Sequence, residues 1–389
     1  MQKKIIALAV AGLVSGVAFA QTNVTVYGLI DQAYVYSKSD NGLTGANSGD
    51  YKYSGLKDGG LNGSRIGFKG EEALGNGLKA IFTFEIGKDA DNESSTVNFT
   101  NRQSFVGLNG NFGTFTAGRQ YNAAALFYAK NNSNDVTGVM PVNSLQGQNL
   151  SQIRSGGGTA RQENVLKYVS PNWSGFTVGA SYSFGEHPQT VNTLNSNNAS
   201  IYDKRVDVTD NGRYSVAADY SNGPFNISAA YAVVDGARGT TTYSAAEGKD
   251  VKEWFVGAGF DFKVVKLYAT YQDLKNDNDT LTTVTDQKLW SVGLSAPVST
   301  MGKAYLEYAK LDTDTDNGFN NNANARFDGA SKGWGVGYEH YLSKRTTLYT
   351  QFSQIKHDND VASTGTWVSG AAARGEKQTN FMAGLRHTF

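Results

Sequence analysis

The feature that most constrains this chain is an alternation of apolar and polar residues that recurs up to the C-terminus. The stretch LKAIFTFEIG (78–87) is typical: in an extended strand Phe82 and Phe84 point to one side, and Lys79 and Glu85 point to the other. Each such segment has an apolar face that must meet a protein core or lipid. Sixteen segments show the pattern: 24–36, 64–70, 78–87, 102–110, 113–120, 163–169, 176–184, 213–220, 225–234, 253–262, 265–272, 288–296, 304–311, 332–342, 347–355 and 381–389.

The connections between these segments alternate in length. Short turns such as 75–77 and 222–224 separate long polar stretches such as 121–160, 186–211 and 311–331. A transmembrane β-barrel has short periplasmic turns, long external loops and an even number of strands in its bacterial single-chain forms. A soluble sandwich of this size remains an alternative, but it would leave long edge strands to be covered.

We therefore expect an all-β fold, a sixteen-stranded antiparallel transmembrane β-barrel. The lumen of a barrel of this size is wide enough for water and charged side chains, so the polar faces would line it. The apolar face of residues 78–87 would then meet lipid. An exported soluble β-protein, such as an enzyme or an adhesin, is the competing interpretation.

The first twenty residues, MQKKIIALAVAGLVSGVAFA, have the features of a secretory signal peptide. Lys3 and Lys4 precede an uncharged run that ends in the small residues Ala18 and Ala20. A membrane-anchoring helix is the alternative, but the run is shorter than the ~20 apolar residues that a span requires. We expect a signal peptide at 1–20 with cleavage after Ala20, and one barrel domain at 21–389.

Composition excludes several classes of function. The chain contains no cysteine, which excludes a disulfide framework and thiol chemistry. Without the two leader lysines, 33 basic residues face 35 acidic ones, so no strong global field favours nucleic acid as a partner. No apolar stretch after residue 20 has the length of a membrane helix, so a helical membrane protein is excluded.

No motif predicts an enzyme, a metal site or a cofactor. Glu71 and Glu72 are adjacent in a strand and point to opposite faces, so they cannot converge as the carboxyl pair of a glycosidase. The four histidines are scattered without zinc-ligand spacing. DTDTDNG (312–318) mimics part of a calcium loop but lacks its glycine and glutamate, and we interpret it as a solvated loop or a weak divalent-cation contact.

Several longer stretches carry a family resemblance. They are VTVYGLID after the leader, SRIGFKGEEALGNGLKAIFTFE, RQSFVGLNGNFGTFTAGRQY, KYVSPNWSGFTVGASY and the closing GLRHTF. With the loop pattern, they make the mature chain resemble the Gram-negative general-diffusion porins, the trimeric sixteen-stranded family of the outer membrane. SRIGFKGEEALGNGLKA is the most specific piece.

The resemblance implies particular functional residues. In that family a long third loop folds into the barrel and faces a group of arginines on the opposite wall. Here the arginines correspond to Arg65, Arg102 and Arg161, and Lys69 shares the side of Arg65 in its strand. The constriction loop corresponds to about 121–160.

The expected loop departs from the enteric members of the family, which carry at least two acids in it. Its only acid is Asp135, whereas Lys130 and Arg154 are basic. An excess of positive charge in a narrow passage favours anions, so we expect anion preference. Alternatively, the arginines pair with wall carboxylates such as Glu85 or Asp31 and merely line a wide pore.

The resemblance also implies partners. It predicts a homotrimer in the outer membrane of a Gram-negative bacterium, in contact with lipid and lipopolysaccharide, that passes small ions and solutes. The final residue of the chain, Phe389, resembles the terminal aromatic residue that the outer-membrane assembly machinery recognises. We expect a water-filled channel for passive diffusion, or alternatively a substrate-specific channel, without catalytic residues or a cofactor and without a nucleic-acid partner.

Overall fold

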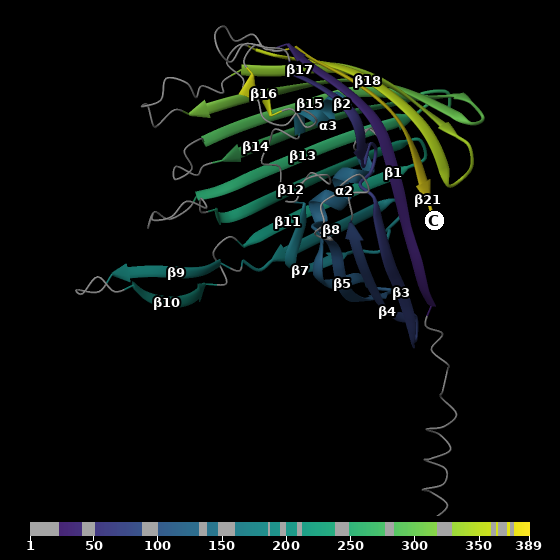
Figure 1. The fold of residues 1–389 in the computed structure, drawn as a ribbon. Helices are drawn as coiled ribbons and strands as arrows, with labels where there is room; N and C mark the ends of the chain where they lie inside the picture. Colours follow the sequence, from purple (N-terminus) through teal and green to yellow (C-terminus); the bar gives the residue numbers. More distant parts are fainter. Residues whose placement is uncertain are drawn as a thin grey trace, which may run out of the picture.

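The strands form one closed antiparallel β-barrel (Figure 1). The computed structural model describes residues 23–40, 51–87, 100–131, 138–146, 160–185, 187–194, 200–207, 212–237, 249–276, 284–316, 329–358, 363–364, 372–373 and 377–389. The wall consists of β1 (Asn23–Asp40), β2 (Tyr51–Asp58), β3 (Arg65–Gly75), β4 (Leu78–Gly87), β5 (Thr100–Gly110), β6 (Gly113–Tyr121), β7 (Arg161–Val169), β8 (Phe176–Ser183), β11 (Arg213–Asn222), β12 (Phe225–Ala237), β13 (Lys249–Asp261), β14 (Lys266–Asn276), β15 (Val284–Ser299), β16 (Gly302–Asp316), β17 (Gly329–Tyr341), β18 (Thr346–His357) and β21 (Lys377–Thr388).

The barrel has sixteen strand positions because β2 and β3 share one of them. Along the same edge of β1, residues 32–39 pair with β2 and residues 23–29 pair with β3. The other edge of β1 pairs with β21, the last strand, and this pairing closes the barrel. The predicted sixteen-stranded antiparallel barrel is confirmed. β2 is not predicted by the alternation, because its residues Lys52, Ser54 and Leu56 share a face and mix polar and apolar side chains.

The two faces of the wall differ as the alternation predicts. On β11 and β13 the side chains of Val216 and Trp254 are exposed, whereas those of the neighbouring Ser215 and Glu253 are buried. The exposed apolar side chains lie on the outside of the barrel, and the buried polar ones lie on the inside. This arrangement is the reverse of a soluble protein and is typical of a transmembrane barrel.

The two ends of the barrel also differ. At one end, tight turns join consecutive strands, such as the Gly75–Asn76–Gly77 turn, in which all three residues have positive φ. Asparagine and glycine adopt this left-handed conformation at low cost, and they are therefore the common residues of short hairpins. The long stretches between strands leave from the opposite end, which is the external end of such a barrel.

Two helices lie in the connection between β6 and β7. They are α2 (Ala123–Asn131) and α3 (Pro141–Gln146), which lie within the predicted loop 121–160. Helix α2 packs against β8 and β11–β13, and α3 packs against β15–β18. Among the described residues, no helix combines the length and apolar character needed to cross a membrane.

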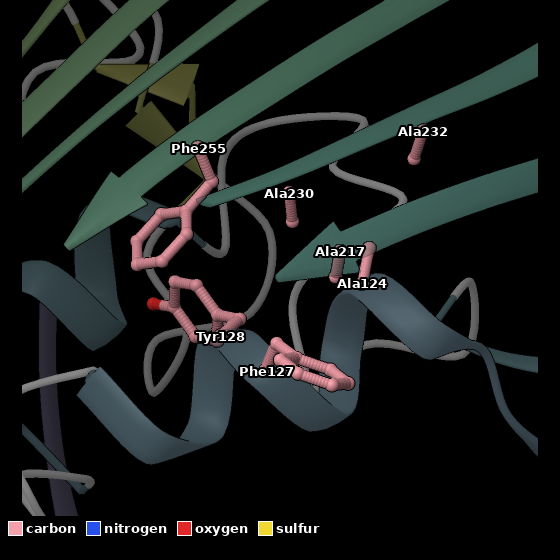
Figure 2. Packing of buried hydrophobic residues seen from close by; sticks show 7 residues of the cluster. All are labelled: Ala124, Phe127, Tyr128, Ala217, Ala230, Ala232 and Phe255. Atoms are coloured by element: carbon pink, nitrogen blue, oxygen red, sulfur yellow. The ribbon is translucent and has the colours of Figure 1, made fainter. Parts of the chain in front are cut away.

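Aromatic and small side chains hold α2 on the wall. Phe127 and Tyr128 face Ala217, Ala230 and Phe255 on β11–β13 (Figure 2). The ring centroids of Tyr128 and Phe255 are 4.7 Å apart in an edge-to-face arrangement, which is a favoured geometry for aromatic pairs. The alanines of the wall make room for the two rings.

Some segments differ from their expected conformation. Asp312–Asp316 belongs to β16, so the solvated-loop interpretation of 312–318 is wrong for this part, because pairing with β15 extends the strand.

The stretch 186–211 contains the separate hairpin of β9 (His187–Leu194) and β10 (Ser200–Asp207). The short strands β19 (Ser363–Thr364) and β20 (Ala372–Ala373) also pair with each other. The predicted signal peptide lies outside the described residues.

Candidate pore-lining site

The three arginines predicted to line the pore lie on alternate strands of the inner wall. Arg65 begins β3, Arg102 lies in β5, and Arg161 begins β7. They gather around the carboxylate of Glu85 on β4 and the ring of Tyr121 at the end of β6. We call these five residues the arginine cluster.

Glu85 is the acceptor at the centre of the arginine cluster. Arg102 Nε donates to its Oε1 over 2.6 Å, and Arg65 Nη1 lies 3.9 Å from the same oxygen. Tyr27 on β1 donates its hydroxyl to the other oxygen, Oε2, over 3.0 Å. A buried carboxylate needs such partners because its desolvation is costly. The alternative that a wall carboxylate pairs with the arginines is therefore realised in part, with Glu85.

Tyr121 connects the remaining arginine to the group. The guanidinium carbon of Arg161 lies 5.7 Å from the centre of the Tyr121 ring, a cation–π geometry. The Tyr121 hydroxyl in turn accepts a hydrogen bond from Arg102 Nη2 over 3.5 Å. Within the described part of the chain, Nε and Nη1 of Arg161 have no hydrogen-bond partner.

The arginine cluster carries an excess of positive charge. The cluster contains three guanidinium groups and one carboxylate, so its formal net charge is +2. The side chains of Arg65 and Arg102 are 19% and 13% exposed, whereas that of Glu85 is only 6% exposed. Solutes in the lumen would therefore meet the cations more readily than the anion.

Two further cations, which were not among the predicted site residues, lie beside the arginine cluster. Arg119 pairs with Glu163 at 2.7 Å, and Lys167 Nζ donates to the backbone oxygen of Tyr121 over 2.9 Å. An irregular register between Gly118 and Gln120 alters the alternation near Arg119. The strand pattern could have placed Lys167 on the inner face, because it shares the parity of the buried Val165.

Two acids of the wall across the barrel from the arginine cluster are buried against protein partners. Glu307 on β16 is buried and accepts the backbone N–H of Val142 in α3 over 2.7 Å. Glu253 on β13 is also buried and accepts a hydrogen bond from the amide of Gln272. These carboxylates are occupied by protein partners, which lowers their availability to cations in the lumen.

The other predicted site residues are placed only in part. Lys69 Nζ lies 5.4 Å from the centre of the Tyr27 ring, so Lys69 is linked to Glu85 through that tyrosine. Lys130 falls within α2, but its side chain lies outside the described residues, as do Asp135 and Arg154. Among the described residues, no group of three or more potential metal ligands comes together.

The C-terminal residue contributes to barrel closure. Phe389 and Gly28 exchange both backbone N–H···O hydrogen bonds, each at 3.0 Å. The Phe389 ring lies over Gly28, where an added Cβ would approach the ring to 2.5 Å. Glycine at position 28 therefore leaves room for the terminal ring beside the first strand.

Comparison with known proteins agrees with this architecture. The family model described as Gram-negative porin matches residues 7–360. Outer membrane porin protein 32 of Delftia acidovorans is 33% identical over the full length of both chains. An outer membrane porin protein of Bordetella pertussis is 28% identical, also over both full lengths.

Solved structures share the barrel. An anion-selective porin from Comamonas acidovorans superimposes with a TM-score of 0.71 and 28% identity, covering 95% of this chain and all of that chain. The trimer form of OmpT from Vibrio cholerae has a TM-score of 0.63 at 16% identity, covering 95% of this chain and 99% of that chain. At that identity the second likeness shows the fold alone.

Proposed function

Because the chain belongs to the Gram-negative porin family, whose members are channels of the outer membrane rather than enzymes, we propose that it is an anion-preferring diffusion channel. It passes small hydrophilic solutes and ions, and the arginine cluster biases their passage by charge. The observation that carries this proposal is a charge excess: Arg65 and Arg102 share a single, largely buried carboxylate, Glu85, and Arg161 stacks on Tyr121 beside them.

The physical basis is the field of fixed charges in a narrow passage. Walls of low dielectric constant focus this field, and rings of arginine or lysine raise the local concentration of anions. The solved porin from Comamonas acidovorans is described as anion-selective. Its similarity supports the same preference here, alongside the charge balance of the cluster.

We assign residues 121–160 as the constriction loop that folds into the lumen. The described part of this loop supports the assignment, because it contacts the inner face of the wall at two places. The backbone N–H groups of Ala123 and Ala124 donate to Ser181 and Ser215. The N–H of Val139 donates to Gln351 on β18 over 3.0 Å. A segment held at both sites narrows the space in front of the arginine cluster.

A planar-bilayer recording tests the proposed function. The purified full-length protein, placed in a potassium chloride gradient, should give stepwise ohmic conductance and a zero-current potential of the sign for chloride. The double variant Arg65→Ser/Arg102→Ser should shift this potential toward the potassium sign. The matched variant Lys344→Ser/Arg345→Ser removes two cations from an exposed turn before β18 and should not shift it.

Other results would reject parts of the proposal. An unchanged zero-current potential in Arg65→Ser/Arg102→Ser would remove the arginine cluster as the source of selectivity. A zero-current potential of the sign for potassium in the unmodified protein would overturn the anion preference. It would not contradict the proposal that the protein is a diffusion channel. Saturating block by one solute class would favour the substrate-specific channel instead.

Two further expectations complete the proposal. The protein would form a homotrimer. Cross-linking in mild detergent should yield trimers, and monomers alone would contradict this.

The mature chain would begin at Gln21, after removal of a signal peptide at 1–20. Mass spectrometry of protein from the outer membrane should find Gln21 at the N-terminus, and an intact Met1 would contradict cleavage.

A further inference from the structure

Four lysines form a continuous row across four neighbouring strands. Lys310 on β16 lies directly opposite Lys332 on β17, Lys332 opposite Lys356 on β18, and Lys356 opposite Lys377 on β21. We call them the lysine row. Because the residues are register partners, all four share one face of the sheet.

The lysine row lies on the outer surface of the barrel, at the edge of its apolar band. Two residues nearer the middle of the strands stand Tyr308 and Trp334, which are register partners, and beyond them lie exposed apolar residues such as Leu306 and Val336. Aromatic residues mark the membrane interface in such barrels. Long lysine side chains just beyond them reach into the headgroup region.

The row lies at the external end of the barrel. β16 ends at Asp316 and β17 begins at Gly329, so the long connection between them leaves from this end, whereas the tight turn after Ser299 lies at the other. In Figure 1, β16 ends on the same side of the barrel as β12 and β14. The lysine row therefore faces the outer leaflet of the outer membrane.

Such a row is unfavourable without a counterion. Directly opposite residues on paired strands have Cβ atoms about 4.5–5.5 Å apart, and like charges at these positions are destabilising. Lys310 pairs with Asp312 at 2.7 Å. Within the described part of the chain, no carboxylate lies within ion-pair distance of Lys332, Lys356 or Lys377.

The carboxylates near the row leave it positive. Asp358 follows β18 and accepts a hydrogen bond from the backbone N–H of Ala330. Asp40 is the register partner of Lys377 on β1, and its side chain lies outside the described residues. Among the described strands, even with Asp312, Asp358 and Asp40 all ionised, four lysines are set against three carboxylates, and Asp312 and Asp358 lie two residues beyond the row.

We propose that the lysine row binds the phosphorylated headgroup of lipopolysaccharide. The lysine ammonium groups would contact its phosphates, and its acyl chains would lie along the exposed Leu306, Val336 and Phe381. Charge complementarity favours this occupant, because its phosphates are anionic and the lysine row carries an excess of positive charge. The proposal rests on the outer-membrane location and not on anion preference.

A binding measurement on the folded, full-length protein in detergent tests this site. The probe is a short-chain lipopolysaccharide, added with EDTA so that no divalent cation bridges the contact, and bound lipid is counted by native mass spectrometry. The variant Lys310→Gln/Lys332→Gln/Lys356→Gln/Lys377→Gln should bind at least tenfold more weakly. Removing the lipid phosphates should weaken binding to the unmodified protein by a similar factor and have little further effect on the variant.

A matched control removes four cations from the short-turn end: Lys79→Gln/Lys263→Gln/Lys344→Gln/Arg345→Gln. It should bind the probe as the unmodified protein does. Equal binding by the lysine-row variant would overturn the proposal. Equally tight, equally lysine-dependent binding of phosphatidylglycerol would overturn the assignment to lipopolysaccharide and indicate a general anionic-lipid surface.

Two measurements keep this test independent of folding and of channel function. Heat-modifiable electrophoretic mobility reports the folded barrel, and if the fourfold variant does not fold, Lys332→Gln and Lys356→Gln alone should each weaken binding about threefold. Unchanged affinity in both single variants would equally overturn the proposal. Ion selectivity of the variants, recorded in the same preparations, should be unchanged, so failure of the lipid site and failure of the anion-preferring channel are distinguishable.

Discussion

Arg102 and Glu85 form an ion pair of 2.6 Å on the inner wall of the barrel, between neighbouring strands. Glu85 also accepts the Tyr27 hydroxyl and lies near Arg65, so one carboxylate orients several cationic and phenolic groups. The pair thus positions Arg102, yet it cancels only part of the positive charge. Glu85 is for this reason the residue whose removal most directly tests the charge balance.

Glu85→Gln should increase the anion preference. The change removes one negative charge from the arginine cluster while keeping a hydrogen-bond acceptor for Arg102. We expect the chloride-to-potassium permeability ratio to rise about twofold or more, as measured from the zero-current potential. Glu71→Gln, which affects the exposed Lys79–Glu71 pair near a turn, is the control and should leave the ratio unchanged. A lower ratio in Glu85→Gln would contradict this prediction.

Salt should weaken the anion preference. The Debye length falls from about 10 Å at 0.1 M salt to about 3 Å at 1 M, so mobile ions screen the field of the arginine cluster. At a fixed concentration ratio, the zero-current potential should move toward zero as both concentrations increase. Arg65→Ser/Arg102→Ser should show a smaller salt effect. A potential that is independent of salt in the unmodified protein would indicate selection by size instead of charge.

Phe127→Ala/Tyr128→Ala should loosen the proposed constriction loop. Truncating a buried aromatic residue typically costs about 3–5 kcal/mol, and here the cost falls on the contact between α2 and the wall. We expect a larger single-channel conductance with more open-channel noise. Phe260→Ala, which truncates an exposed aromatic residue of β13, should leave both unchanged. If the double variant folds and conducts as the unmodified protein does, α2 does not restrict the passage.

Phe389→Ala should slow or reduce assembly into the outer membrane. The terminal ring packs over Gly28, and the backbone of Phe389 pairs with β1, so its loss weakens the closing seam. The folded fraction in membranes, measured by heat-modifiable mobility, should fall severalfold. Phe381→Ala removes an exposed ring from β21, the strand that directly precedes Phe389, and should have a smaller effect. Equal folded fractions in the two variants would contradict a special role for Phe389.

The alternation of side chains predicted most of the fold. Residues 78–87, 113–120 and 347–355 coincide closely with β4, β6 and β18, because a strand with one face in lipid and one toward the lumen must alternate along its whole length. Where a segment does not alternate clearly, its strand was not predicted. β2 mixes polar and apolar residues on one face, and Asp312–Asp316 extends β16 although the sequence suggested a loop.

The pore-lining site was also predicted only in part. The resemblance selected Arg65, Arg102 and Arg161, and strand parity placed Arg65 and Lys69 on the polar face. Neither indicated that Tyr121 would lie between Arg102 and Arg161, or that Lys167 would bond to its backbone. These contacts join strands whose relative positions depend on closure of the barrel.

By itself, the sequence determined the class of fold and the face that each strand residue occupies, because both follow from a local period of two residues. Only the tertiary structure decided which residues from distant positions became neighbours. It placed Glu85 between Arg65 and Arg102, covered Glu307 with α3, and aligned Lys332 with Lys356. The physical reason is that cross-strand neighbours depend on register, which hydrogen-bond pairing around the whole closed barrel fixes and no single strand encodes.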